Sequence, residues 1–222
     1  MSYHNGPKIV NDGLICYLDA GNSRSYSGSG TTVYDLSGNG NDFIIQGNVS
    51  WSSTVGFGNF EGNSTGSGNK IYRSGFPTNL KVAQGGSGLT IMAIARSNVT
   101  GGWRKLIGNG DGENYIDLYQ GTSTCAWHQD GSGETLYYNA GVSVANDALL
   151  INDNVWRVLW ATNLNSGTTT NPAAALTLGN EPGSSNSYPW IGNIAVFLLY
   201  NIILSTDEMI KNFDALRGRF SL

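Results

Sequence analysis

The sequence predicts an all-β protein built as a sandwich of two antiparallel sheets, with one short helix near the C-terminal end. Short apolar runs alternate with turns of Gly, Asn, Ser and Asp, a pattern typical of strands joined by tight loops. Six Trp, eleven Tyr and seven Phe provide core material, so the 31 glycines do not indicate disorder. At 222 residues the chain has the length of one sandwich domain.

The expected strands are the apolar segments between the turn clusters. Many short strands at this spacing are typical of a sandwich. In chain order they are Leu14 to Leu18, Asp42 to Gln46, Lys70 to Tyr72, Leu89 to Arg96, Arg104 to Ile107, Asn114 to Tyr119, Thr124 to His128, Thr135 to Tyr138, Val155 to Thr162, Ala174 to Leu178 and Trp190 to Tyr200.

Two of these strands indicate how their faces are covered. Trp156, Val158 and Trp160 share one face by the strand period of two, while Arg157 stands on the other, so we expect one core face and one partly wet face. Ile194 to Tyr200 is apolar on both faces, which predicts a central strand covered on each side. The cover is either the second sheet or a neighbouring subunit.

The expected helix follows the last strand. Ser205-Thr-Asp-Glu208 has the pattern of a capping box, in which Ser205 accepts from the third helical amide and Glu208 reaches back. Met209, Ile210, Phe213 and Leu216 then share one face at helical spacing, and Gly218 follows the last turn. The pattern predicts an amphipathic helix of about three turns.

Two signatures at opposite ends of the chain resemble concanavalin A-like (laminin-G-like) jelly-roll domains of bacteriophage virion proteins. The first is the strand Gly13 to Asn22, followed by the Asp-Leu-Ser-Gly-Asn turn within Val33 to Asp42. The second and more specific is Trp190 to Glu208, which is similar to the closing strand and helix of these domains. The middle segments that add to the resemblance are Phe60 to Gly62, Leu89 to Ala95 and Trp156 to Trp160.

The resemblance spans nearly the whole chain, in which we see no internal repeat and no linker. We therefore expect one jelly-roll domain over residues 11–222, preceded by an N-terminal arm, residues 1–10, with no core pattern of its own. The family implies a virion structural protein, either a capsid decoration protein or a tail-fibre or adhesin module. Its expected partners are other virion proteins of the capsid or tail, further copies of itself, and a host surface glycan.

Composition and charge exclude several other classes. The net charge is −4 and the 12 Lys and Arg are scattered, so we expect no nucleic-acid binding. The longest apolar run, Ile194 to Tyr200, is too short to cross a bilayer, and the N-terminus lacks a leader pattern. We expect synthesis in the host cytoplasm and a final location in the virion. Cys16 and Cys125 are expected to be reduced and buried, with a disulfide between them as the alternative.

Catalysis has to be weighed because relatives of this fold include glycoside hydrolases. Their carboxylates lie at alternate positions of a strand, as in Glu-x-Asp-x-x-Glu, and this chain has no such run. The nearest pattern is Asp111, Glu113 and Asp117, where a glycine separates the first two acids. Motifs of serine hydrolases, zinc proteases and phosphate-binding loops are absent. We therefore expect that the protein is not an enzyme, and a polysaccharide-cleaving glycosidase is the less favoured alternative.

Calcium is the metal for which the sequence offers candidate ligands. Asn109, Asp111 and Glu113 offer alternating oxygen ligands, although the full spacing of a calcium loop is missing. The simpler interpretation is that Asn and Asp side chains satisfy their own turns, as we also expect for Asp35 and Asp42. No cofactor is expected to be required.

A sugar site would need exposed aromatic faces next to amides and carboxylates. Trp127, His128 and Asp130 supply this mixture in four residues, and Trp103 and the run Tyr188-Pro-Trp190 are lesser candidates. For any single Trp of a sandwich, core packing is the simpler role. The alternative function to a docking protein is therefore a lectin for host attachment, with Trp127 and Asp130 in its site.

Overall fold

The computed structural model describes residues 8–54, 56–62, 68–75, 88–97, 104–109, 116–120, 124–129, 134–138, 142–144, 149–150, 153–163, 175–180, 188–220 and 222. Only the backbone is described for residue 109, for the strand residues between 116 and 150, and for residue 163.

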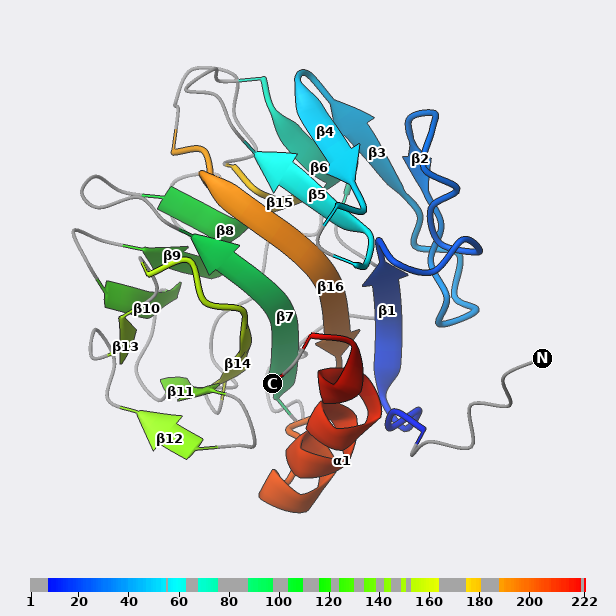
Figure 1. Cartoon of the computed structure of the whole chain (residues 1–222). Helices are drawn as coiled ribbons and strands as arrows, with labels where there is room; N and C mark the ends of the chain where they lie inside the picture. The colour runs from blue at the N-terminus through cyan, green and yellow to red at the C-terminus, as the bar shows by residue number, and fades with distance from the viewer. Residues whose placement is uncertain are drawn as a thin grey trace.

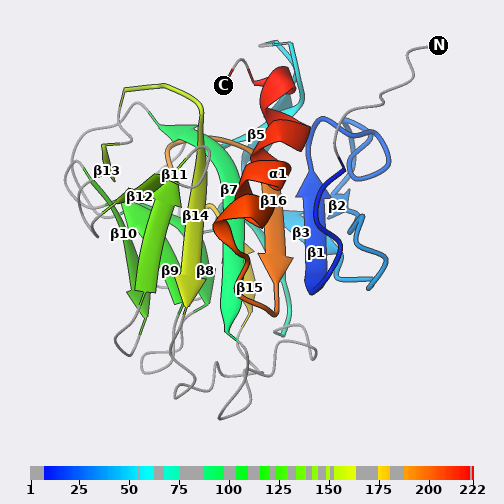
Figure 2. The same ribbon diagram turned by 90° about the horizontal axis from the view of Figure 1, so that it is seen from below.

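The described chain forms two antiparallel sheets and one helix, so the predicted fold class is confirmed (Figures 1 and 2). Sheet A has the order β12 (Val142–Val144), β11 (Glu134–Tyr138), β14 (Arg157–Asn163), β7 (Leu89–Ser97), β16 (Gly192–Tyr200), β5 (Asn59–Gly62) and β4 (Val49–Ser52), and β1 (Leu14–Asp19) also pairs with β16. Sheet B has the order β13 (Leu149–Leu150), β10 (Thr124–Gln129), β9 (Ile116–Gln120), β8 (Arg104–Asn109), β15 (Leu176–Leu178), β6 (Lys70–Arg73), β3 (Phe43–Gln46) and β2 (Thr32–Val33).

Each expected strand overlaps an observed one, and the strands that sequence reasoning missed are short. They are β2, β4, β5, β12 and β13, of two to four residues each. The sequence of β4 is Val-Ser-Trp-Ser and that of β5 is Asn-Phe-Glu-Gly, so each carries polar residues at half of its positions or more. Such segments do not stand out from turns by composition, and only their pairing with a neighbour makes them strands.

Strand β16 is the centre of sheet A. It pairs with β7 along its length, with β5 over Gly192–Ile194 and with β1 over Val196–Tyr200, so β5 and β1 lie end to end along the same edge. At their junction the Trp51 indole donates to the Ala20 carbonyl at 2.9 Å. A side chain at Gly58 would collide with that same carbonyl, so the chain can pass there only as glycine.

Strand β16 is buried on both faces because the centre of sheet A lies between sheet B and the helix. On β16, Phe197 and Leu199 pack in the core between the sheets, whereas Leu198 and Tyr200 pack in a second core with α1 (Thr206–Leu216). Figure 2 shows α1 lying across this sheet. The cover that the sequence left open is therefore the second sheet on one face and the chain's own helix on the other.

The same two cores change the interpretation of β14. Trp156, Val158 and Trp160 do share one buried face, as predicted, and it is the face under the helix. The expectation of a partly wet opposite face was wrong beyond Arg157, because Leu159 and Ala161 are each 1% exposed in the core between the sheets. A strand of a middle layer has no wet face.

The helix begins at the predicted capping box. Ser205 Oγ accepts from the Glu208 amide at 3.4 Å, and Glu208 accepts from the Ser205 amide at 2.8 Å. The hydrogen bonds that the Glu208 carboxylate accepts from the Ser205 amide and from the Ser205 hydroxyl lower the pKa of Glu208 below its usual value. Gly218 follows the last turn of the helix, as predicted, and lies within a 3₁₀ turn, η2 (Arg217–Arg219).

The chain enters the domain beside α1 through a buried ring of hydrogen bonds. The Val10 amide donates to Asn212 Oδ1 at 2.7 Å, Asn212 Nδ2 donates to the Tyr200 hydroxyl at 2.9 Å, and that hydroxyl donates to the Val10 carbonyl at 3.1 Å. Val10 is 6% exposed and Asn212 is fully buried. The last residue of the predicted arm is thus fixed to the domain, while residues 1–7 lie outside the described part.

Cys16 is a buried, free thiol, so the expected reduced state is confirmed for it and a bridge to Cys125 is excluded. Burial, with a smaller contribution from the charge of Asp35, raises the pKa of this thiol well above its usual value. No helix among the described residues is long and apolar enough to span a membrane.

Candidate functional site

A row of register partners runs across the strands of sheet B, and we call it the outer row because one of its members, Ile44, is exposed. Ile44 of this row is 40% exposed, whereas Ile45 on the next position packs against the core between the sheets. Tyr72, also in the row, is half-buried, and Lys70 Nζ lies 5.8 Å from the centre of its ring. The row consists of Thr32, Ile44, Tyr72, Thr177, Gly108, Asp117 and His128.

The register separates the two neighbouring residues that were predicted to share a sugar site. His128 pairs with Asp117 in the outer row, while Trp127 pairs with Leu118. Leu118 in turn pairs with Ile107, a core residue between the sheets. Trp127 therefore stands at a register position of the core row, and the role of its side chain stays a prediction. Asp130 and Trp103 lie outside the described residues.

The predicted calcium ligands fall mostly outside the described residues as well. Asn109 is the last residue of β8, whereas Asp111 and Glu113, in the connection to β9, are not described. Asp117, the third acid of the glycosidase alternative, lies on β9. In the described part of the chain, no three His, Cys, Asp or Glu side chains come close enough together to hold a metal ion.

The Asp35 turn is satisfied by its own chain, as the simpler interpretation predicted. Asp35 accepts from the amides of Tyr17 and Ser37, each at 2.9 Å, and from the Asn41 amide at 3.0 Å. The Asp42 carboxylate accepts from the Asp35 amide at 2.8 Å. These two acids therefore fasten the turn to β1 and keep few acceptor positions for an ion.

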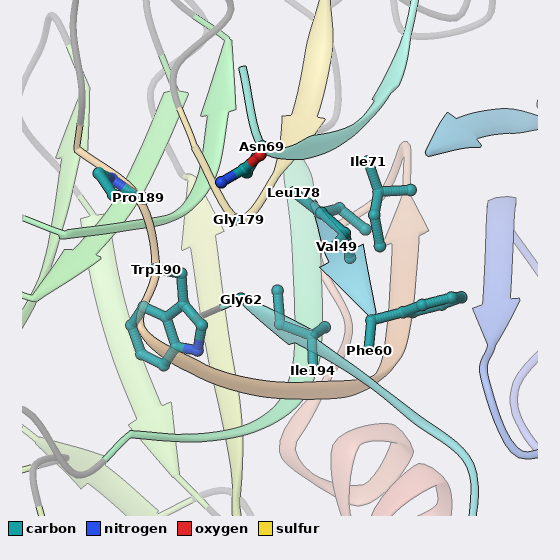
Figure 3. A pocket seen from close by; sticks show the side chains of 10 residues that line it. All are labelled: Val49, Phe60, Gly62, Asn69, Ile71, Leu178, Gly179, Pro189, Trp190 and Ile194. Carbon is teal, nitrogen blue, oxygen red and sulfur yellow. The ribbon is translucent and has the colours of Figure 1, made fainter. Parts of the chain in front are cut away.

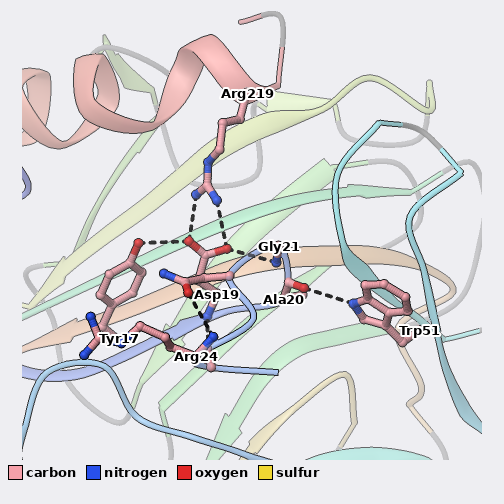
Figure 4. A network of polar contacts seen from close by, with 9 residues as sticks. Tyr17, Asp19, Ala20, Gly21, Arg24, Trp51 and Arg219 are labelled. Atoms are coloured by element: carbon pink, nitrogen blue, oxygen red, sulfur yellow. Dashed lines mark hydrogen bonds and ion pairs between the residues drawn. The ribbon is translucent and has the colours of Figure 1, made fainter. Parts of the chain in front are cut away.

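A buried carboxylate at the end of β1 is saturated by protein donors (Figure 4). Asp19 is 1% exposed, and Arg219 donates to both of its oxygens, at 3.0 and 2.8 Å. The Tyr17 hydroxyl donates at 2.9 Å and the Gly21 amide at 3.0 Å. Four donors fill the acceptor positions of the carboxylate, so this network is a clamp between the C-terminal segment and β1.

The clamp shifts the pKa of the groups around it. Burial, followed by the charge of Asp19, raises the pKa of Tyr17. Burial alone lowers the pKa of Arg219, but its hydrogen bonds and charge pairing with Asp19 outweigh burial, and the net shift is upward. Both shifts keep the donors protonated around the carboxylate.

A pocket between the sheets is too narrow for a sugar ring (Figure 3). It encloses about 310 Å³, open solvent included, between Val49, Phe60 and Ile194 of sheet A and Ile71 and Leu178 of sheet B. Inside there is room for about one water molecule. Trp190, which also lines it, is 1% exposed, so this lesser sugar candidate is a core residue.

A half-buried arginine on the outer face of sheet A is the described group best arranged to bind a ligand. The α1 helix begins near Thr90, at the start of β7, where the Thr90 hydroxyl accepts from the Leu204 amide at 2.9 Å. Arg96 lies near the opposite end of β7. The Arg96 guanidinium carbon lies 4.9 Å from the centre of the Trp156 ring. Its Nε donates to Asn193 Oδ1 at 2.9 Å.

Behind Arg96 a chain of buried amides leads to the backbone. Asn193 Nδ2 donates to Asn59 Oδ1 at 2.8 Å, and Asn59 Nδ2 donates to the Ser52 carbonyl at 3.1 Å. Glu61 is half-buried and pairs with Asn193 in the register of β5 and β16. We call Arg96, Trp156, Asn193, Asn59 and Glu61 the Arg96 patch.

Sequence reasoning missed this patch, although one signal was present. Arg96 has the same parity on β7 as Met92 and Ile94, which lie under the helix, so a charged residue ends an otherwise apolar face. Its amide partner is 97 residues away in the chain and could not be inferred from local pattern.

No protein-family model and no curated protein matches this sequence. Solved structures do match the fold. The binding domain of Paraclostridial Mosquitocidal Protein 1 is 15% identical, with a TM-score of 0.64 over 91% of this chain and 52% of its own. The receptor-binding domain of botulinum neurotoxin C/D mosaic serotype is 13% identical, with a TM-score of 0.61 over 93% of this chain and 52% of its own. This chain therefore spans about half of these domains.

A third match is a Trypanosoma rangeli sialidase in complex with sialic acid, which is 14% identical, with a TM-score of 0.58 over 95% of this chain and 34% of its own. The match contradicts the expectation that the protein is not an enzyme. That expectation rested on the absence of known catalytic motifs from the sequence, whereas nearly the whole chain aligns within an enzyme. At these identities the matches show a shared β-sandwich fold, and one fold serves both binding domains and enzymes.

Proposed function

We propose that this protein is a bacteriophage virion component, a capsid decoration protein or a tail-fibre or adhesin module, that docks onto other virion proteins and binds a host glycan. The phage part rests on the resemblance of Gly13 to Asn22 and Trp190 to Glu208 to virion jelly rolls. The binding part is supported by the fold that the chain shares with receptor-binding domains. Synthesis in the host cytoplasm and a virion location belong to the same proposal.

The observation that carries the glycan part is the Arg96 patch. A ligand site orients its ligand with a small number of precisely placed charged and polar groups. The patch combines an arginine, which lies over the buried ring of Trp156 and is held by amides, with a half-buried carboxylate on one face of a rigid sheet. A site on strands is held more precisely than one on loops.

A glycan array with purified protein, run once with calcium and once with a chelator, tests the binding part. We expect a signal that is lost in Arg96→Gln and retained in Arg24→Gln, which changes an exposed arginine elsewhere. Loss in His128→Ala with Arg96→Gln unaffected would move the glycan site to sheet B. Silence of the array under both conditions would contradict the binding part.

The docking part concerns the N-terminal arm, which we propose contacts a neighbouring subunit. Val10 is fixed beside α1 and Ile9 packs against the core that includes the helix, so the arm joins the domain at a defined point. Deletion of residues 1–8 should spare folding, because the Val10 hydrogen bonds remain, but abolish incorporation into particles. Electron microscopy of particles assembled with the truncated protein checks this, and normal incorporation would refute the arm.

A further inference from the structure

We infer that the Arg96 patch recognises the carboxylate of an acidic sugar. The inference rests on the proposed glycan binding and names the class of ligand. Its starting point is the state of the guanidinium: Nε is occupied by Asn193, and among the described residues neither terminal nitrogen of Arg96 has a hydrogen-bond or ion-pair partner. The two terminal nitrogens are a fork that matches a carboxylate with two parallel hydrogen bonds.

The fork is held in place before any ligand binds. The guanidinium carbon lies over the Trp156 ring, and Asn193, itself 9% exposed, fixes its Nε. Asn193 is in turn held by Asn59, which is 1% exposed and anchored to the backbone at Ser52. An arginine that is already ordered loses little conformational freedom on binding, which favours recognition by this residue over a mobile surface charge.

In the described part of the chain, neither of the two nearby carboxylates, Asp153 and Glu61, neutralises Arg96. Asp153, in the turn before β14, is engaged by two 2.6 Å hydrogen bonds from Arg157. Glu61 lies two strands away in the row, about 10 Å at the usual strand spacing, with Asn193 between. At this distance Glu61 does not pair with the terminal nitrogens of Arg96. It would repel a second negative charge on a ligand, and its oxygens can accept hydrogen bonds from the ligand's hydroxyls.

These charges select the ligand. One open cationic fork beside an acidic acceptor fits a sugar that carries a single carboxylate and several hydroxyls, such as a uronic or sialic acid. A polyphosphate or polysulfate would bring extra negative charge against Glu61. The aromatic cluster under the patch adds an apolar support: the Phe57 ring lies 5.1 Å from Trp156 and 4.5 Å from Phe220.

The test measures binding of the methyl glycosides of glucuronic, galacturonic and N-acetylneuraminic acid, each against its neutral methyl ester, by NMR titration of the full chain. At least one acid should bind about tenfold more tightly than its ester, since a charge-assisted fork is lost in the ester. Arg96→Gln should remove the difference, and Arg96→Lys should retain part of it because the charge stays but the fork does not. Arg24→Gln is the matched control and should behave as wild type.

Three outcomes would overturn the inference: no acid binds better than its ester, the preference survives in Arg96→Gln, or Arg24→Gln removes it equally. Thermal unfolding of Arg96→Gln separates loss of the site from loss of the fold. Array binding of neutral glycans without an acid preference would leave the proposed function standing and refute the ligand class. Silence of the array together with no binding of any acid would refute both.

Discussion

Two arginines lie against the same aromatic cluster and have opposite surroundings. Arg219 lies 5.2 Å from the Phe220 ring and gives both terminal nitrogens to Asp19. Arg96 lies 4.9 Å from Trp156, whose ring is 5.9 Å from Phe220, and is held through Nε by a neutral amide. The first guanidinium neutralises a buried charge of the protein, and the second keeps its charge and its fork for another molecule.

The comparison shows that the identity of the residue does not decide its role. A buried carboxylate needs a permanent partner, because an unpaired charge in the interior is costly. A neutral amide can orient a guanidinium without using its charge, so the attraction remains available for a ligand. The surroundings of a third arginine, Arg157, are intermediate, because it pairs with a carboxylate, Asp153, as Arg219 does, but near the surface.

The largest expected effect is at the clamp. Asp19→Ala removes the partner of Arg219 and the acceptor of Tyr17, and should lower the free energy of unfolding by about 3 kcal/mol. The loss stays below the upper end for buried pairs because the Arg219 side chain is 35% exposed and regains water. Urea denaturation measures it, with Asp12→Ala at an exposed site as the control. A loss below about 1 kcal/mol would contradict the role of Arg219 as the partner of a buried charge, and with it the contrast to Arg96.

Asn193→Ala should have an intermediate effect on stability. Asn59 Oδ1 would lose its donor in a buried position, which costs about 1–2 kcal/mol in urea denaturation. The same variant frees Arg96 Nε, so the preference for acidic sugars should weaken without disappearing. Asn48→Ala, at an exposed position, is the control. Unchanged sugar binding would show that the amide does not position Arg96.

Arg96→Gln should change stability by less than about 1 kcal/mol, because it removes one hydrogen bond and a ring contact of a half-buried side chain. The measurement is the unfolding midpoint in urea alongside that of Asp19→Ala. A loss as large as that of Asp19→Ala would make Arg96 a structural residue and remove the contrast between the two arginines.

The smallest effect is expected at the surface pair. The hydrogen bonds from Arg157 lower the pKa of Asp153 to about 2 from its usual 3.8. A lowered folded-state pKa adds stability above the unfolded value, and this stability is lost as the pH falls from about 4 to about 2. Because the side chain of Asp153 is 45% exposed, Asp153→Asn should cost less than about 0.5 kcal/mol at pH 7. Urea denaturation at pH 7 and pH 3 should show a smaller difference at pH 3.

The strands and the helix were predictable where the signal is local. The capping box at Ser205 lies within four residues, and the alternation of Trp156, Val158 and Trp160 lies within five. What packs on each face of this strand was not predictable. Leu159 is buried by the other sheet, and Trp160 packs in the core that includes the helix. Periodicity shows which residues share a face and not what packs on it.

The candidate sites divide in the same way. Trp127 and His128 were grouped because they are adjacent in sequence, yet the register places them in different rows of sheet B. The Arg96 patch escaped notice because its members come from three strands, β7, β16 and β5, and the turn before β14. Adjacency in a strand alternates between faces, whereas a site on a sheet is assembled across strands.

The sequence by itself determined that this chain forms a β-sandwich with one capped helix, since turn residues, strand alternation and capping act over a few residues. The tertiary structure alone decided which arginine is a clamp and which is open. Arg219 meets Asp19 across 200 residues, and Asn193 meets Asn59 across 134. Such partners are brought together by strand register and helix docking, and no local pattern in the sequence encodes them.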